Sequence, residues 1–240
     1  MKKNGNRALL ALLFVVLFSS CTKEDFCPAN AQPKNLRLKE MIWGERSYTF
    51  YYNQHNDVDS VRAEDKSDHY TYRVYYTGRH IDSVALIDGG VALSTHTQFT
   101  YNGDKITGYT YHWYTDPPAF VNRTTFTYDS KGRMATATRD GAPLLNITYG
   151  DSNNIRTMIF AGNTYIYTQY DSKLNPLYYV HNLFAIFTEE SAIWQDEFSQ
   201  HNTAGPGIVN QYNALDQLVK KTVDPPGGPL GDNFLFSYYP

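Results

Sequence analysis

Four carboxylates lie close together near residue 190 of the chain, at Glu189, Glu190, Asp196 and Glu197. Glycoside hydrolases use a pair of such carboxylates, one as general acid and the other as nucleophile or base. Neighbouring acidic residues on a helix more often form a solvated face, and these four lack the spacing of a calcium-binding loop. The cluster therefore favours a surface role, with a carboxylate-dependent glycoside hydrolase as the less favoured alternative.

Other catalytic and metal-binding patterns are missing from the sequence. It contains no Gly-x-Ser-x-Gly, no phosphate-binding loop and no dinucleotide fingerprint. The histidines lack the compact spacing of a helical zinc site; they are His55, His69, His80, His96, His112, His181 and His201. We therefore expect no catalytic residue, no metal and no cofactor, and the chain is not predicted to be an enzyme.

The densest aromatic cluster is the alternating series Tyr109, Tyr111 and Trp113, which shares one face of a predicted strand. Flat aromatic faces on an exposed sheet can stack on sugar rings, so the series is a candidate glycan platform. A buried core face is the commoner explanation in a chain with 21 Tyr and 13 Phe. Together with Trp194, these three residues are the candidate ligand-binding residues.

The N-terminal segment has the features of an export signal. Basic residues precede an apolar run over 8–18, which matches a signal-peptide core and is short for a membrane span. Ser19-Ser20-Cys21 then resembles a bacterial lipobox, although Phe18 stands where Leu is commonest. This resemblance implies that residues 1–20 are removed and that Cys21 carries the lipid. An ordinary secretory peptide cleaved elsewhere is the alternative.

The residues after Cys21 predict the location of the protein. Thr22-Lys23-Glu24-Asp25 resembles the surface-export signal of Bacteroidetes lipoproteins. We therefore expect an outer-membrane protein attached to the membrane through the lipid on Cys21 and facing outward, with the periplasmic face as the alternative. Cys27 is the remaining cysteine, so no internal disulfide is predicted. Residues 21–35 are interpreted as a flexible lipidated tether.

The charge of the body argues against a nucleic-acid partner. Without the three basic residues of the leader, the chain has 18 basic and 24 acidic residues, a net charge of −6. A mildly acidic body without a basic cluster does not provide the positive surface that DNA and RNA require. The partners that we expect are the membrane, through the anchor, and a glycan or another envelope protein.

The candidate residues lie within a repeated unit, of which Phe126–Met134 is the clearest copy. Each copy has alternating aromatics, a polar turn and an aliphatic residue five to seven positions after the last aromatic. The last aromatics are Tyr52, Tyr76, Tyr101, Tyr128, Tyr149, Tyr170, Tyr212 and Tyr238, and the aliphatics are Val58, Ile81, Ile106, Met134, Ile155, Leu177 and Leu218. Alternation with period two is typical of antiparallel strands that have one buried and one wetter face.

The turns have a common chemistry. Asn or Asp often opens the turn, where its side chain can bond the backbone two residues on. Asn56, Gly132 and Asn153 occupy the same offset, which suits a left-handed residue that closes a bulged hairpin. Seven hairpins and a final strand predict about fifteen strands in one domain over 36–240. A sheet of that size usually curls or closes, so we expect an all-β, long antiparallel meander rolled into a barrel-like sheet.

The repeat is interrupted between Tyr170 and Tyr212. The apolar residues Phe184, Phe187, Trp194 and Phe198 favour an amphipathic helix within 181–200 that plugs or caps the rolled sheet. Two irregular strands are the alternative. Because the repeat itself acts as scaffold, a localised function is expected within this interruption.

Tyr128-Asp129 with Gly132-Arg133 resembles the tyrosine–aspartate (YD) repeat of Rhs-type shell proteins. The leader with its repeated Tyr-Asn/Asp hairpins is similar to Bacteroidetes lipoproteins of unknown function that have a porin-like fold. This resemblance implies a large barrel-like sheet and transfers no catalytic residue. The leading hypothesis is a non-catalytic binding or interaction module, and a structural scaffold of an envelope complex is the alternative.

Overall fold

A computed structural model describes residues 36–66, 68–114, 120–150, 152–180, 182–186, 198–223 and 232–240. The leader with Cys21, the tether, and Trp194 with its four neighbouring carboxylates lie outside these residues. The strands are β1 Leu38–Trp43, β2 Arg46–Tyr52, β3 Val58–Glu64, β4 His69–Thr77, β5 His80–Asp88, β6 Val91–Asn102, β7 Lys105–Trp113, β8 Phe120–Tyr128, β9 Met134–Arg139, β10 Ala142–Tyr149, β11 Ile155–Phe160, β12 Asn163–Ile166, β13 Gln169–Leu174, β14 His201–Ala204, β15 Ile208–Tyr212, β16 Leu218–Val223 and β17 Asp232–Tyr238. Among the described residues, no helix is long and apolar enough to cross a membrane.

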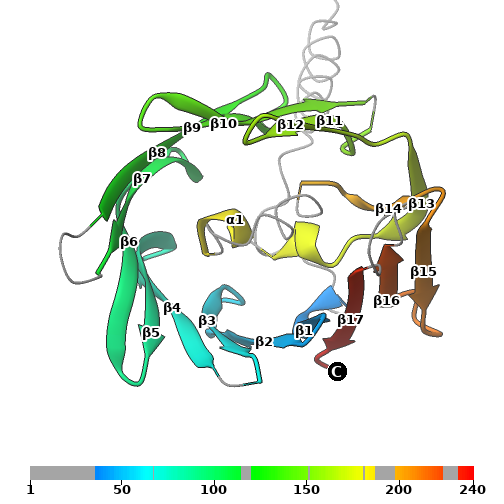
Figure 1. Ribbon diagram of the computed structural model, residues 1–240, viewed down its shortest axis with the longest axis horizontal. Coiled ribbons are helices and arrows are strands. Elements are labelled where there is room, and N and C mark those ends of the chain that lie inside the picture. Colours follow the sequence, from blue (N-terminus) through cyan, green and yellow to red (C-terminus); the bar gives the residue numbers. More distant parts are fainter. Residues whose placement is uncertain are drawn as a thin grey trace, which may run out of the picture.

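Fifteen of these strands form one antiparallel sheet, in the order β12 to β1 followed by β17, β16 and β15. Neighbours in the sequence are therefore neighbours in the sheet, as a meander requires. The pairing of β1 with β17 joins the two ends of the domain and rolls the sheet into a ring (Figure 1). The predicted all-β meander of about fifteen strands is confirmed, although β12 and β15 remain the two edges of an unclosed sheet.

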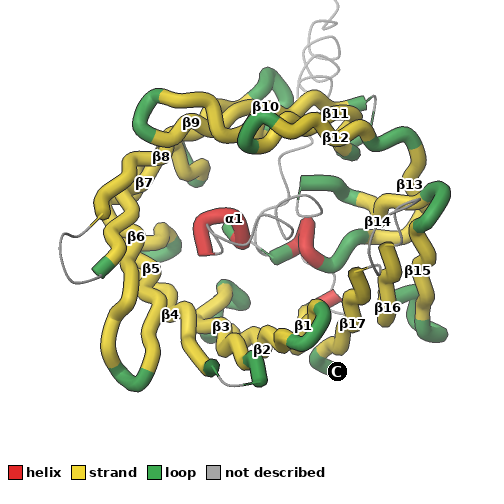
Figure 2. Tube along the Cα trace, viewed as in Figure 1, coloured by secondary structure: helices red, strands yellow, loops and turns green. Residues whose placement is uncertain are grey.

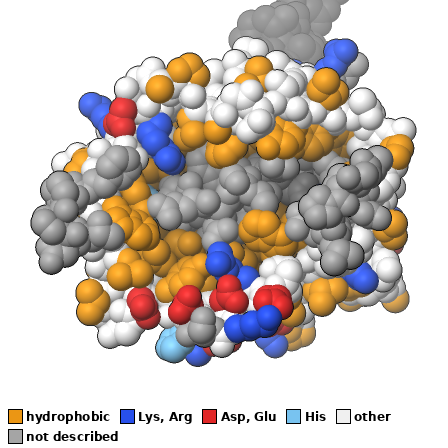
Figure 3. All heavy atoms as spheres, viewed as in Figure 1, with side chains coloured by type: hydrophobic (Ala, Val, Ile, Leu, Met, Phe, Trp, Pro, Cys, Tyr) orange, Lys and Arg blue, Asp and Glu red, His pale blue; other side chains and the backbone are white. Residues whose placement is uncertain are grey.

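The inner wall of the ring forms the hydrophobic core. On β2, Tyr48 and Phe50 are fully buried, whereas Tyr51, the residue after Phe50, is 44% exposed on the outer face. The same alternation places Tyr72 and Val74 of β4 inside. Figure 3 shows hydrophobic side chains gathered around the inside of the ring. Period-two alternation therefore selects the buried face, because successive strand residues point to opposite sides.

The outer wall is polar and is stabilised by cross-strand pairs. Thr125 and Thr127 of β8 pair with Thr138 and Thr136 of β9, at hydroxyl separations of 2.6 and 2.7 Å. Cross-strand hydroxyl pairs of this kind stabilise antiparallel strands. The many threonines between the aromatics are therefore explained by the wetter face of the sheet.

The interruption of the repeat contributes a plug to the centre of the ring. It contains a 3₁₀ turn, Leu177–Tyr179, and a short helix α1, Leu183–Ile186, both inside the ring of strands (Figure 2). The side chain of Leu183 is fully buried, and Phe184 packs edge-on against Phe126 of β8 at 5.1 Å between ring centroids. The predicted helical insertion that fills the rolled sheet is therefore present in the described part, while 187–197 lie outside it.

The turns use the predicted side-chain chemistry. The Asn53 carboxamide oxygen accepts hydrogen bonds from the backbone N–H groups of His55 and Asp57 at 2.8 and 3.1 Å. Asp129 and Asn213 make the same pair of bonds in their own turns. These local bonds fix each hairpin from the residue that opens it.

The left-handed closing residue is confirmed at two of three positions. Asn56 and Gly132 have φ values of 69° and 78°. Asn153 is not among the described residues with positive φ, so the prediction is wrong there. Asp216 takes this conformation instead in the β15–β16 turn, with φ of 60°. Six of the hairpins have a register shift immediately before the last tyrosine, as a bulged hairpin requires.

A polar network bridges the gap between the two edges of the large sheet, together with the small β13–β14 sheet. Asp171 of β13 accepts hydrogen bonds from the Tyr212 hydroxyl and from the Asn210 amide of β15. Asn202 of β14 donates to the Tyr212 hydroxyl at 3.0 Å, and buried Lys221 of β16 donates to Thr203 at 2.7 Å. Side-chain hydrogen bonds therefore join the small sheet to the β15 edge of the large sheet.

Candidate binding surface on the tyrosine rim

The tyrosines of the repeat line one rim of the ring, which we call the tyrosine rim. Seven of the eight donate their hydroxyl hydrogen to the backbone carbonyl of the aliphatic residue that starts an adjacent hairpin. The pairs are Tyr52–Leu38, Tyr76–Val58, Tyr101–Ile81, Tyr128–Ile106, Tyr149–Met134, Tyr170–Ile155 and Tyr238–Leu218, at 2.5–2.9 Å. Each tyrosine therefore fastens its hairpin to an adjacent one. The eighth, Tyr212, bonds to Asp171.

Basic and aromatic side chains cover four of these tyrosine rings. The guanidinium of Arg37 lies 4.5 Å from the centre of the Tyr52 ring, and that of Arg133 lies 4.1 Å from the Tyr149 ring. The Lys105 ammonium and the His80 ring cover Tyr128 and Tyr101 in the same way. Each covering residue immediately precedes the residue whose carbonyl accepts the hydroxyl. Two consecutive residues therefore contact each of these four tyrosines: the side chain of the first covers the aromatic ring, and the carbonyl of the second accepts the hydroxyl hydrogen.

This environment disfavours ionisation of the tyrosines. Burial raises the pKa of Tyr101 to about 12; the hydrogen bond with Ile81 partly lowers it, and the negative charge of Asp82 raises it further. Burial likewise raises the pKa values of Tyr52, Tyr76, Tyr128 and Tyr238. A neutral phenol can donate the hydrogen bond to the carbonyl, whereas a phenolate cannot. The shifts therefore have a structural explanation and need no catalytic one.

Replacing Tyr128 by Phe removes the hydroxyl that donates to the Ile106 carbonyl at 2.5 Å. We expect the free energy of unfolding to fall by about 1–3 kcal/mol, because the hydrogen bond is lost and the Ile106 carbonyl loses its hydroxyl donor. Urea denaturation of the two proteins measures the change. Tyr75→Phe is the matched control, since Tyr75 lies 44% exposed on the outer face and should change stability by less than about 0.5 kcal/mol. Equal losses in both variants would contradict a fastening role.

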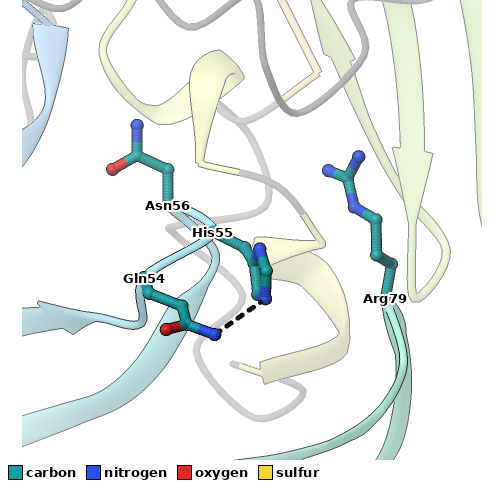
Figure 4. Close-up of a pocket in the computed structure, with 4 residues that line it drawn as sticks. All are labelled: Gln54, His55, Asn56 and Arg79. Carbon is teal, nitrogen blue, oxygen red and sulfur yellow. Dashed lines mark hydrogen bonds between the residues drawn. The ribbon is translucent and has the colours of Figure 1, made fainter.

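The tyrosine rim contains a cavity of about 430 Å³ between two of its turns. Gln54, His55 and Asn56 from the β2–β3 turn and Arg79 from the β4–β5 turn line it (Figure 4). The Gln54 amide nitrogen lies 3.2 Å from His55 Nε2. An amide nitrogen donates, so Gln54 can serve as the donor of this contact. The cavity is lined by hydrogen-bonding side chains from two separate hairpins, and we call it the rim notch.

The charge of Arg79 is unbalanced within the described part of the chain. Its side chain is exposed and makes no ion pair with any described residue. By contrast, Arg46 pairs with Asp65, and Arg133 pairs with Asp129 at 2.7 Å. The rim notch therefore has an available guanidinium on one side and neutral donors on the other.

A second cavity, of about 250 Å³, is formed by β3, β4 and the β5–β6 turn. Arg62, Tyr70 and Gly90 are among its lining residues. Arg62 is already paired with Glu64 at 2.6 Å, so this cavity has less free charge than the rim notch. The described residues contain no group of three or more His, Cys, Asp or Glu side chains arranged to hold a metal ion.

The candidate glycan platform lies on the inner wall. Tyr109 and Tyr111 are buried, at 2% and 7% exposed, and Trp113 is partly buried against the same core. The aromatic series is therefore part of the packed face, and its role in ligand binding stays a prediction. Trp194, Cys21 and the four carboxylates of the hydrolase alternative lie outside the described residues.

The sequence interpretation missed a set of buried polar residues beside this aromatic series. His96 of β6 and Asn122 of β8 both oppose Tyr111, and they are 3% and 4% exposed. Thr124 opposes Tyr109 in the adjacent row. Burial lowers the pKa of His96 to about 3, assisted by the positive charge of Arg139, so this imidazole stays neutral. Asn122 and Thr124 alternate with Phe126 on the same face of β8, so the strand pattern could have predicted that they are buried.

Comparisons with known proteins agree with the fold. A scan of protein families finds no match, and neither does a search of curated proteins. A crystal structure of a porin-like protein from Bacteroides uniformis matches with a TM-score of 0.51 and 12% sequence identity. The match covers 84% of this chain and 98% of that chain. The predicted porin-like fold is therefore confirmed as a fold.

Proposed function

We propose that this protein is a lipid-anchored, non-catalytic binding protein of the bacterial outer membrane. The observation that carries the proposal is the rim notch, whose cavity is open between two turns and is lined by Gln54, His55, Asn56 and Arg79. Small-molecule sites are concave and present a few convergent polar groups. The centre of the ring is a weaker candidate for a binding site, because the packed side chains of Leu183 and its neighbours lie there.

The proposed anchor is the lipid on Cys21, followed by a tether over 22–35. The lipobox-like Ser19-Ser20-Cys21 and the acidic Thr22–Asp25 segment support this proposal and its outward orientation. The likeness of the fold to a Bacteroides protein is consistent with membership among the Bacteroidetes lipoproteins that the hairpin repeat resembles. The lipid would hold the ring at the membrane and leave the tyrosine rim available to envelope ligands.

A glycan is the ligand class that we favour for the rim notch. Sugars present many hydroxyls, which pair with amide, imidazole and guanidinium groups such as those of Gln54, His55 and Arg79. A scaffold that binds another envelope protein is the second candidate. It is favoured by the edge strand β12, which pairs only with β11 in the described sheet and exposes 70% of Ile166. Unpaired strand edges are ready sites for strand addition by a partner chain.

Two variants of the full chain test the proposal in cells of its host. Cys21→Ala is expected to abolish incorporation of an alkyne-tagged fatty acid and to release the protein from the membrane fraction. Cys27→Ala is the matched control and should retain the label. The lipidated protein purified in detergent should bind at least one oligosaccharide from an envelope-glycan array. Retention of the label in Cys21→Ala would contradict the anchor, and a blank array would contradict glycan binding.

The scaffold alternative is better tested at an exposed strand edge than by deletion of residues 181–205, which include the plug. Leu183 and Ile186 are fully buried, so the deletion would remove core and destabilise the ring. Ile166→Lys is a sharper test, because a charge on an exposed edge blocks strand addition without changing the core. Loss of a co-purifying envelope protein in this variant would support the scaffold, and its retention would argue against it.

A further inference from the structure

We propose that the rim notch recognises an anionic group on its ligand, and that the ligand is an acidic glycan bearing carboxylates. This inference rests on the proposed binding function and specifies the ligand class. Its basis is the guanidinium of Arg79, which projects beside the cavity without an ion pair to any described residue. An arginine fork binds a carboxylate through two parallel N–H bonds, which are stronger than bonds between neutral groups.

The other residues of the rim notch can contribute donors around the same anion. Gln54 and Asn56 provide amide N–H groups, and the His55 imidazole lies between them in the sequence, with Nε2 3.2 Å from the Gln54 amide nitrogen. Figure 4 shows Asn56 and Arg79 on opposite sides of His55, with their polar ends directed the same way. The described lining contains no Asp or Glu. A carboxylate placed between the two sides would therefore meet donors from both turns and no acidic side chain among the lining residues.

The backbone holds both sides of the rim notch in place. Asn53 fixes the β2–β3 turn through its bonds to the N–H groups of His55 and Asp57. Arg79 lies between Gly78, whose φ is 65°, and His80, which stacks on Tyr101 at 4.2 Å and pairs with Asp104. The backbone of both turns is therefore fixed, and the exposed side chains of the rim notch remain to be ordered by the ligand. Preorganised donors reduce the entropic cost of binding.

The local charge matters because the body carries a net charge of −6. The general field of the protein repels anions, so binding of an acidic glycan requires a specific cation at the site. Arg79 supplies that cation between two turns of the tyrosine rim. Binding should weaken as salt increases, because ion pairs at exposed sites are screened.

Titration calorimetry on the full chain in detergent tests the inference with an oligogalacturonate, a neutral oligosaccharide of equal length, and inorganic phosphate. We expect the oligogalacturonate to bind and Arg79→Gln to weaken its binding about tenfold or more, since a charge-assisted pair is lost. Arg123→Gln is the matched control. Its arginine is exposed on the outer wall of β8, and the variant should bind normally. If phosphate competes with the oligogalacturonate at similar concentration, the result would support an anion site and identify phosphate as the group that it binds.

The outcomes separate this inference from the proposed function. Binding of the neutral oligosaccharide that equals oligogalacturonate binding and is unchanged by Arg79→Gln would overturn the anionic specificity and leave the binding function standing. No binding of any probe would overturn both. Equal unfolding midpoints of Arg79→Gln and the parent protein should accompany a positive result, because Arg79 is exposed and has no described ion-pair partner.

Discussion

Replacement of Leu183 by Ala is expected to lower the free energy of unfolding by about 2–5 kcal/mol, because it opens a cavity where α1 fills the ring. Leu183 has no exposed surface, and its helix lies inside the circle of strands (Figure 1). The plug and the wall share one core, since Phe184 contacts Phe126 of β8. We therefore expect the loss to appear in the unfolding of the whole domain, measured by guanidinium denaturation followed by circular dichroism.

Leu215→Ala provides the control for this prediction. The side chain is the same, but Leu215 is 66% exposed in the β15–β16 turn, and the substitution should change stability by less than about 0.5 kcal/mol. If Leu183→Ala left the global transition unchanged and only created a separate early transition, the plug would be an independent unit. The shared core argued above would then be wrong.

The hairpins could be predicted because their determinants are local. Asn53, Asp129 and Asn213 bond to backbone groups two and four residues ahead, so each turn is specified within its own segment. The tyrosine alternation shows which face of most strands is buried. Consecutive hairpins then pair in order, which gives the meander. Fold class and strand number therefore followed from repeated short-range patterns.

The hydroxyl-to-carbonyl bonds of the rim tyrosines, which we call the tyrosine ladder, could not be predicted, because each hydroxyl reaches a carbonyl in an adjacent hairpin. Tyr128 and Ile106, for example, are 22 positions apart. The repeat showed that both residues recur, but their contact depends on the register of several strands. The pairing of β1 with β17 is longer in range still and has no local signal.

The buried polar residues were missed for a related reason. In β6, His96 lies inside, yet Thr100, at the same sequence parity, is exposed. Gln98 between them has φ of 54° and lies at a register shift, which moves the following side chains to the opposite face. After a single bulged residue, strand alternation therefore no longer predicts which side chains are buried. The rim notch was not predicted either, because its two sides come from different turns.

The tyrosine ladder also predicts a steep loss of stability in alkali. Burial raises the pKa values of Tyr52, Tyr76, Tyr128 and Tyr238 in the folded protein above the ordinary value of about 10. Below pH 10 both states keep the phenolic protons, so the full stabilisation is present. As the pH rises above 10, the unfolded chain releases protons that the folded chain retains. The equilibrium therefore shifts toward the unfolded chain, and the stabilisation is lost toward the raised folded values.

These four tyrosines should lower stability by about 5 kcal/mol for each pH unit above 10, at about 1.4 kcal/mol per group. A domain with a stability of about 5–15 kcal/mol would then unfold cooperatively between about pH 11 and 13. The part of the tyrosinate absorbance that comes from the buried tyrosines should change together with the circular dichroism, since these phenols ionise when the sheet unfolds. Tyr128→Phe should make this pH dependence less steep, because one of the phenols whose pKa is raised in the folded protein is removed. Ionisation of all the tyrosines, the buried ones included, with unchanged circular dichroism would contradict the ladder, because phenolates cannot donate to the carbonyls that hold adjacent hairpins together.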